Sequence, residues 1–408
     1  MTQTLGGAEG VLDDGELTAF LEEQLAGIDL DGRSLCVVIP DATRRCPLRL
    51  LLPALERAVS GRVSRCTVVV ALGTHAPMSD AAIADMVGPT GMAVVNHEWW
   101  DESAFTHLGT LTASRVAELS AGHLREDVAI RVNRLVTDAD VTLIVGPVLP
   151  HEVVGFSGGH KYLFPGLSGK ELIDLTHWLG ALITSREIIG TPGVTPVPAI
   201  IEAAAALVPG ERHALCLVND EHTDAIHFAA FGDPFDAWNE AAAVAAATHV
   251  VHLDRPARRV LSMVAARYDD LWTGAKGFYK VEPVVADGGE VVLYAPHITE
   301  IAATHPGLLD VGYHCRDFFL AHWDRYRDHP WGELAHSTHL YGSGTWDAST
   351  GEEHQRVTVT LATGIPREVV ESVNLSYLDP AAVDPELFAA DPHTLVVPDA
   401  GEVLYRLR

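Results

Sequence analysis

The sequence predicts two α/β domains built on mainly parallel sheets. Three observations support this prediction: the length, the alternation of short apolar runs with helical patterns, and the repetition of that alternation in the second half. The chain has 408 residues, which suits two domains of about 150–250 residues better than one. Hydrophobic residues make up 48% and charged residues 20%, so a sizeable core is available and disorder is not expected.

In the first half, short runs rich in Val, Ile and Leu end at turn-forming residues and are expected to be strands. Continuous apolar runs of this kind are typical of a parallel sheet that is covered on both faces. Helical patterns lie between them, and Ser79 is a suitable N-cap for one of these helices. The expected strands are 34–40, 66–72, 141–149 and 213–220, and the expected helices are 48–59, 79–87 and 197–208.

The second half repeats the pattern. The expected strands are 258–266, 290–296, 356–363 and 393–399, and the expected helices are 234–247 and 315–326. Because the helix at 234–247 is expected to close the first sheet, we predict domains at 1–255 and 256–408.

Charge and cysteine content exclude several classes of protein. A formal net charge of −27 repels nucleic acid and anionic membranes, so neither is an expected partner. The five cysteines form no CxxC pair, which argues against a disulfide framework and a thiolate metal site. The N-terminus does not resemble a signal peptide, and no apolar stretch of about 18 residues exists. We therefore expect a soluble, cytoplasmic protein.

Polar and glycine-rich segments follow four of the expected strands, at 41–47, 73–77, 150–166 and 267–277. Ligands of open α/β sheets bind outside the carboxyl ends of the strands. Four such segments predict an active site in one cleft, between the two domains.

His75 and His151 each follow an expected strand directly. Two histidines on opposite sides of a carbon centre suit a two-base racemase, in which one removes a proton and the other delivers one. The alternative is that each imidazole only caps a strand or bonds a backbone carbonyl.

The segment GFSGGHK ends at Lys161. Gly158 and Gly159 would let the backbone approach a phosphate and Lys161 would add charge, although the spacing matches neither a Walker A loop nor GxGxxG, and a tight turn is the alternative. Lys161 would alternatively be a covalent attachment point. His177, if helical, would bind a metal, but without HExxH or a cysteine cluster a cofactor must supply the other ligands.

Asp41 and Arg44 stand at another strand end. Arg44 would grip a carboxylate with two hydrogen bonds while Asp41 holds the guanidinium, although a surface salt bridge is the alternative. Lys276 would add positive charge for an anionic substrate, and Trp272 is expected in the core or the pocket wall.

These motifs, DATR, GTHAP, PHEVVGFSGGHKYLFPG and a later THW, resemble those of the lactate racemase family in the same order, over roughly residues 34 to 400. The most specific part is the GFSGGxK…PG segment, with one histidine ten residues before its lysine and another sixteen after it.

The resemblance implies a nickel-pincer nucleotide, a pyridinium-3-thioamide-5-thiocarboxylic acid mononucleotide with nickel. Lys161 would carry it as a thioamide and His177 would be the protein ligand to nickel, in a planar site that suits Ni(II). Thr74, Gly158 and Gly159 would contact the cofactor.

The implied enzyme is an isomerase that inverts C2 of a 2-hydroxyacid by hydride transfer to and from the pincer carbon, with His75 and His151 as the acid/base pair. Asp41, Arg44 and Lys276 would line the substrate pocket, together with Trp272 and, by a looser match, Trp331. The implied partners are this small substrate and the enzymes that synthesise the cofactor.

Three departures from the family pattern predict a substrate other than lactate. Arg45 replaces a proline, Ala76 replaces an arginine, and Trp272-Thr273 replaces a Tyr-Gln pair. The substrate would carry either a second anionic group that Arg45 reads or an aromatic side chain against Trp272.

Two other functions remain open. A divalent-metal hydrolase or lyase would use His75, His151 and Asp41 as ligands and would not need Lys161. A non-catalytic cofactor-binding protein would need Lys161 and His177 but neither of the other two histidines.

Overall fold

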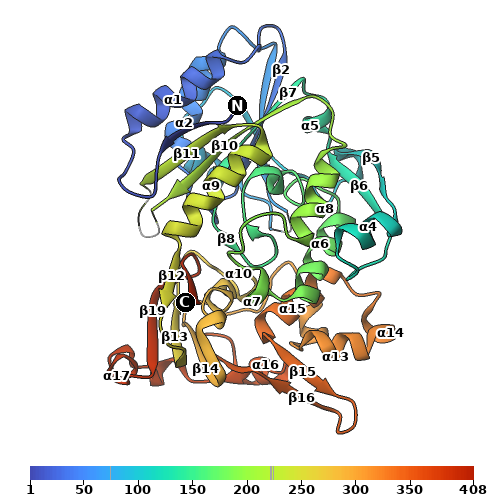
Figure 1. The fold of residues 1–408 in the computed structure, drawn as a ribbon, viewed down its shortest axis with the longest axis vertical. Coiled ribbons are helices and arrows are strands. Elements are labelled where there is room, and N and C mark those ends of the chain that lie inside the picture. The colour runs from blue at the N-terminus through green and yellow to red at the C-terminus, as the bar shows by residue number, and fades with distance from the viewer. Residues whose placement is uncertain (74, 221–222, 224) are drawn as a thin grey trace. The chain divides into compact units, whose positions relative to one another are not determined.

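The computed structural model describes residues 1–73, 75–220, 223 and 225–408, which form two compact units (Figure 1). Unit 1 comprises Met1–Leu149, Phe156–Thr176 and Pro192–Thr248, and unit 2 comprises Pro150–Gly155, His177–Thr191 and His249–Arg408. Three segments of the predicted first domain, 150–155, 177–191 and 249–255, thus belong to unit 2. Their contacts explain this, because Ile189 lies in the core of unit 2 and the Pro150 carbonyl accepts a hydrogen bond from Lys280.

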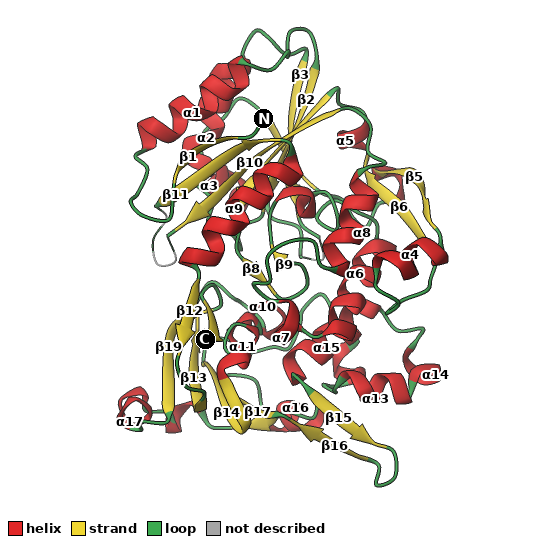
Figure 2. Ribbon diagram, viewed as in Figure 1, coloured by secondary structure: helices red, strands yellow, loops and turns green. Residues whose placement is uncertain are grey.

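Unit 1 contains a seven-stranded sheet in the order β1-β11-β10-β7-β2-β3-β4 (Figure 2). The strands β10, β7, β2, β3 and β4 are parallel, whereas β11 pairs antiparallel with both β10 and β1. The mainly parallel α/β class is therefore confirmed, although β1, β4 and β11 were not predicted. The bounds are β1 Gln3–Gly6, β2 Ser34–Pro40, β3 Arg65–Ala71, β4 Ala93–Asn96, β7 Val141–Pro147, β10 Glu211–Asn219 and β11 Ile226–Gly232.

The central strands are apolar because both faces of the sheet are covered. Helices α1 and α2 pack on one face, where Leu17 and Leu51 join Val37 and Val68 in one core, and α9 lies over β10 and β11 (Figure 1). The chain goes from β2 to β3 on one side and later places β7 on the other. This switch point is where α/β sheets bind ligands, so the residues that follow β2 and β7 are well placed.

The helices of unit 1 follow the expected pattern closely. Ser79 caps α3 as predicted, since its side chain accepts a hydrogen bond from the Ala82 amide. The helices are α1 Asp14–Ala26, α2 Leu48–Val59, α3 Asp80–Val87, α4 Ala113–Leu119, α5 Arg134–Thr137, α6 Lys170–Ile183, whose C-terminal part belongs to unit 2, α8 Pro196–Ala205, α9 Pro234–Thr248, η1 Glu102–Ala104 and η2 Gly159–Tyr162. A small strand pair of unit 1 is formed by β5 Phe105–Leu111 and β6 Val128–Asn133. The short strand β8 Pro150–His151 belongs to unit 2, and β9 Gly155–Phe156 has one residue in each unit.

Unit 2 contains a five-stranded, fully parallel sheet in the order β18-β17-β14-β13-β19. All four strands predicted for the second half belong to it. The strands of unit 2, including the pairs β12–β20 and β15–β16, are β12 Val250–Leu253, β13 Ala257–Val264, β14 Val285–Ala295, β15 Gly344–Asp347, β16 Glu352–Gln355, β17 Val357–Thr363, β18 Ser376–Tyr377, β19 Thr394–Ala400 and β20 Leu404–Leu407.

One predicted helix of unit 2, at 315–326, is wrong as a single element. It is divided into α13 and α14 at His322, whose backbone leaves the helical region and whose imidazole bonds the Phe318 carbonyl. No described helix is long and apolar enough to cross a membrane. The helices are α7 Ser185–Ile188, α10 Leu271–Gly274, α11 Lys276–Tyr279, η3 Glu282–Val284, α12 Leu308–Val311, α13 Arg316–Ala321, α14 Trp323–Tyr326, α15 Trp331–Tyr341, α16 Arg367–Ser372, η4 Pro380–Ala382 and α17 Pro385–Ala390.

Candidate active site

The ends of β2 and β3 bring Asp41 and His75 together in unit 1. Asp41 is 6% exposed, and its Oδ2 accepts a hydrogen bond from Nδ1 of His75. Its Oδ1 accepts from the Thr43 amide at 3.0 Å and from the Thr43 hydroxyl at 2.6 Å. Burial opposes ionisation, but the charge and hydrogen bond of His75, with Arg44 and Thr43, hold the pKa of Asp41 well below its usual range. An ionised Asp41 fixes the proton of His75 on Nδ1, which leaves the lone pair on Nε2.

The predicted task of Asp41, to hold the guanidinium of Arg44, stays a prediction, and the charge of Arg44 is among the causes of the lowered pKa of Asp41. The structure adds two further partners of the carboxylate, His75 and Thr43. Arg44 is partly exposed, and its Nη1 lies 3.3 Å from the Thr43 hydroxyl. An acid at one strand end and a histidine at the next were visible in the sequence, but only the pairing of β2 with β3 joins them.

In unit 2, His151 on β8 has the opposite hydrogen-bond arrangement. It is 7% exposed, and its Nδ1 accepts a hydrogen bond from the Val153 amide at 3.1 Å. Because a backbone N–H can only donate, the neutral ring carries its proton on Nε2.

Glu152 lies beside His151, with its Oε2 3.6 Å from Nδ1 of the ring. Burial opposes ionisation of Glu152, but His151, Lys276 and Lys280 hold its pKa well below its usual range. Lys276 is 8% exposed and lies over the ring of Tyr268. The predicted positive charge at Lys276 is thus buried near an acid. Sequence reasoning missed Glu152 and Lys280, although Glu152 directly follows His151.

Lys161 is the one residue of the segment 153–169 that is not buried. Gly158 and Gly159 before it have φ values of 96° and 53°. A Cβ at Gly158 would lie 2.5 Å from Val148, and one at Gly159 would lie 2.8 Å from Trp238.

The two glycines therefore form a tight turn that packs on protein atoms where a Cβ would lie, and their contact with a phosphate stays a prediction. The Gly159 amide also bonds the buried thiol of Cys216. Thr74, predicted to contact the cofactor, lies outside the described residues.

His177 is helical, as its predicted role required, and is partly exposed on α6. In unit 2, burial lowers the pKa of His339 to about 4, with Glu152 opposing and His177 adding to this shift. Among the described residues, no three or more His, Cys, Asp or Glu side chains form a group that could hold a metal ion.

Trp272 and Trp331, the two tryptophans predicted for the substrate pocket, both pack against other aromatic side chains. Trp272 is stacked between His305, at 3.8 Å between ring centroids, and His336, at 4.4 Å. Trp272 is partly exposed, and an aromatic substrate group against it stays a prediction. Trp331 begins α15, donates its indole N–H to the Arg327 carbonyl and packs on Trp323.

Comparison with known proteins shows similarity to one family over part of the chain. Residues 21–190 match the lactate racemase N-terminal domain. The lactate racemase of Lactiplantibacillus plantarum is 27% identical over 161 residues, which is 39% of this chain and 34% of that protein. This part of the chain is therefore similar to the lactate racemase family. A second member, the lactate racemase of Thermoanaerobacterium thermosaccharolyticum, is 26% identical over 149 residues, or 36% of this chain and 32% of that protein.

Solved structures are similar to this chain over nearly its whole length. A Thermotoga maritima protein matches with a TM-score of 0.91 and 30% identity over 99% of this chain and 100% of that one. The T. thermosaccharolyticum lactate racemase apoprotein matches with a TM-score of 0.77 and 17% identity over 97% and 93% of the two chains, which shows a shared fold. In sequence, the aligned part spans about a third of each curated lactate racemase.

The candidate site residues are divided between the units. Unit 1 holds Asp41, Arg44, His75 and Lys161, and unit 2 holds His151, His177, Lys276, Trp272 and Trp331. Their convergence on one cleft stays a prediction.

Proposed function

We propose that this chain is a racemase or epimerase that inverts C2 of a 2-hydroxyacid with a nickel-pincer nucleotide as cofactor. The observation that carries the proposal is the pair of histidines with opposite hydrogen bonds. His75 donates from Nδ1 to Asp41, whereas His151 accepts at Nδ1 from the Val153 amide. One ring then offers a lone pair at Nε2 and the other an N–H at Nε2, which is the base and acid of a two-base inversion.

The residues fit the cofactor in their donor chemistry. Lys161 is partly exposed in an otherwise buried segment and would hold the nucleotide through a thioamide. His177 is a partly exposed imidazole on a helix and would bind the nickel. No described group of three metal ligands competes with this arrangement, and a cofactor that brings its own ligands suits a single imidazole. When bound, this group supplies a reversible hydride acceptor.

The protein then moves protons and holds charge. His75 would take the proton of the 2-hydroxyl at Nε2, while the ionised Asp41 stabilises the imidazolium. His151 would act from the other face, with the roles exchanged in the reverse direction. Arg44, which is partly exposed, would bind the substrate carboxylate through two hydrogen bonds. Lys276 adds positive potential while its own charge is balanced near Glu152.

We further propose a substrate other than lactate, with a second anionic group that Arg45 binds. Arg45 is partly exposed directly after Arg44, and its backbone is held by the Asn219 side chain, which donates to the Arg45 carbonyl at 2.6 Å. The enzymes that synthesise the cofactor would be partners during maturation.

The deciding experiment measures intact mass and bound metal after co-expression with the enzymes of pincer biosynthesis. We expect wild type to gain the mass of one nucleotide and to bind nickel. Lys161→Ala should lose the added mass, and His177→Ala should lose nickel. Loaded wild type and His75→Asn are then compared on enantiomers of 2-hydroxyacids by chiral chromatography. Zinc or manganese without any nucleotide would overturn the proposal in favour of a metal hydrolase, and a loaded protein that inverts no 2-hydroxyacid would overturn the activity.

A further inference from the structure

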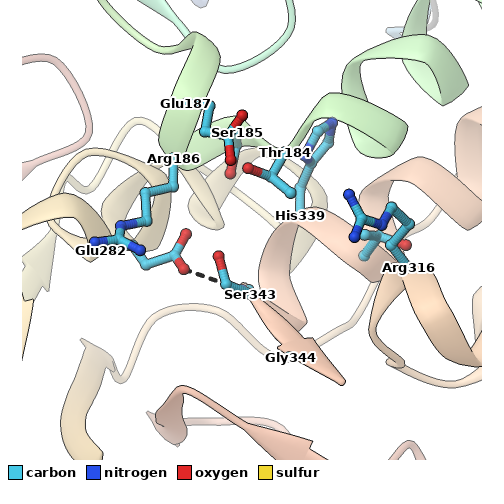
Figure 3. A pocket seen from close by; sticks show the side chains of 11 residues that line it. Thr184, Ser185, Arg186, Glu187, Glu282, Arg316, His339, Ser343 and Gly344 are labelled. Atoms are coloured by element: carbon cyan, nitrogen blue, oxygen red, sulfur yellow. Dashed lines mark hydrogen bonds between the residues drawn. The ribbon is translucent and has the colours of Figure 1, made fainter. Parts of the chain in front are cut away.

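Unit 2 contains a cavity of about 220 Å³ that the racemase proposal does not use (Figure 3). Two charged side chains of its lining are balanced by neighbouring protein groups. Glu282 pairs with Arg356 at 3.4 Å, and Arg316 pairs with Asp317 at 3.0 Å. A contact in unit 1 is more informative than this cavity, because it joins an exposed tryptophan to a proposed catalytic residue.

Residues 97–100, with the sequence His-Glu-Trp-Trp, directly follow β4. This strand pairs in parallel with β3, so the segments that follow the two strands leave the sheet at the same edge. The segment after β3 contains His75. His97 anchors the other segment, because it is fully buried and its backbone amide donates to the Val70 carbonyl of β3 at 3.1 Å.

Hydrogen bonds from two side chains join these segments. The indole N–H of Trp99 donates to the His75 carbonyl at 3.2 Å. The side chain of Asn96, the last residue of β4, donates to the Met78 carbonyl at 2.8 Å and accepts from the Met78 amide at 3.2 Å. The residues 75–78 are thus held at both ends by groups at the end of β4.

Core packing does not account for a tryptophan at position 99. Trp99 is 37% exposed and Trp100 is 50% exposed, and the two rings meet edge to face, with 5.5 Å between their centroids. Tryptophan has an indole N–H that usually finds a hydrogen-bond partner. At position 99 this partner is the backbone of His75, so the hydrogen bond is the specific contribution of the side chain.

His75 needs its backbone held as well as its ring. The hydrogen bond of Nδ1 to Asp41 selects the tautomer, and the His75 amide donates to the Leu72 carbonyl at 2.9 Å. Neither contact holds the carbonyl side of the residue. An acid/base group must stay within about 0.5 Å of its productive position, so a third contact at the carbonyl restricts the movement of the whole residue.

We propose that Trp99 is a positioning residue, which holds the His75 backbone so that Nε2 of the imidazole keeps its place for proton transfer. This inference rests on the proposed function, in which His75 exchanges a proton with the substrate. Trp99 acts through His75 and not on the substrate carboxylate. Its loss should therefore lower kcat and leave KM nearly unchanged.

The first test is hydrogen exchange of the full-length apoprotein by NMR, which needs neither the cofactor nor a substitution. The indole N–H of Trp99 should exchange with solvent at least about threefold more slowly than that of Trp100, for which the described residues provide no hydrogen-bond partner. The Nδ1 proton of His75 should exchange about three- to tenfold faster in Trp99→Phe than in wild type. Equal exchange of the two indoles would overturn the proposal.

The second test is kinetic, on protein loaded with cofactor and with nickel content measured on each sample. Trp99→Phe should lower kcat about three- to tenfold, the effect of one hydrogen bond, with KM within about twofold of wild type. Trp100→Phe is the matched control, because it alters the neighbouring exposed ring, and it should have wild-type kcat and wild-type exchange of His75.

Wild-type kcat in Trp99→Phe with full nickel would refute the positioning role. A rise in KM with unchanged kcat would also refute it, because Trp99 would then act in substrate binding. A loaded wild-type protein that inverts no 2-hydroxyacid would instead overturn the proposed function. In that case the exchange rates of the two indoles and of His75 would still show whether Trp99 holds His75.

Discussion

Replacing Asp41 with asparagine should reverse the proton position on His75. The Thr43 amide and hydroxyl both donate to Oδ1 of Asp41, so in Asp41→Asn they select the amide oxygen at that place. The amide NH2 then faces Nδ1 of His75 and donates to it. Nδ1 becomes an acceptor, the ring proton moves to Nε2, and the base is lost.

The size of the effect follows from the loss of the working tautomer. In a histidine base held by a buried aspartate, this substitution lowers kcat by about 10⁴-fold, which corresponds to about 5.5 kcal/mol in the activation free energy. For a substrate with one stereocentre the two enantiomers have equal free energies. The fall in kcat/KM must therefore be equal in both directions.

The assay is chiral chromatography of loaded enzyme, started from each enantiomer, with nickel content measured on the same samples. Asp13→Asn is the matched control, because Asp13 caps α1 and asparagine caps helices equally well. The reasoning would be refuted if Asp41→Asn with full nickel retained more than about a tenth of wild-type kcat/KM. Loss of the cofactor from this variant would show that Asp41 acts elsewhere.

Two further predictions concern stability. Burial lowers the pKa of His336 to about 3 and of His339 to about 4, so between about pH 6.5 and 4 the unfolded chain binds protons that the folded chain does not. The free energy of unfolding should therefore fall as pH is lowered through this range, by at most about 2.7 kcal/mol per pH unit from the two groups. Calorimetry should show this as a falling melting temperature, and a melting temperature that does not change with pH would contradict the burial of both rings in the neutral form. Gly159→Ala should destabilise by about 1–3 kcal/mol, because it adds strain and a clash with Trp238. Chemical denaturation should show a smaller loss for Gly61→Ala, which has positive φ but open space, and equal losses would show that the clash is absent.

Local patterns in the sequence predicted the strands and helices that hold the site. The run at 34–40 is β2 to the residue, and Ser79 caps its helix as expected. These features depend on neighbours a few positions apart. The strand β11 was not predicted. Its antiparallel direction is set by pairing with β10 and not by its own residues.

The sequence predicted which residues are candidates for the site, but it did not predict which of them contact one another. The hydrogen bond of Asp41 to His75 joins residues from two neighbouring strands, and the stack of Trp272 joins histidines far along the chain. The hydrophobic periodicity of a sequence carries no information about such contacts between distant residues. They follow only from strand order and helix placement, which many sequences with the same local pattern would arrange differently.

The position of Lys161 has a consequence for when the cofactor would be attached during maturation of the protein. Its neighbours in 153–169 are all buried, so this segment is complete in the folded apoprotein, in which Lys161 itself stays partly exposed. On the proposed function, maturation enzymes would modify a finished protein and would not have to act during synthesis. A cell would then hold a reserve of inactive chains and activate them when nickel becomes available, without new translation.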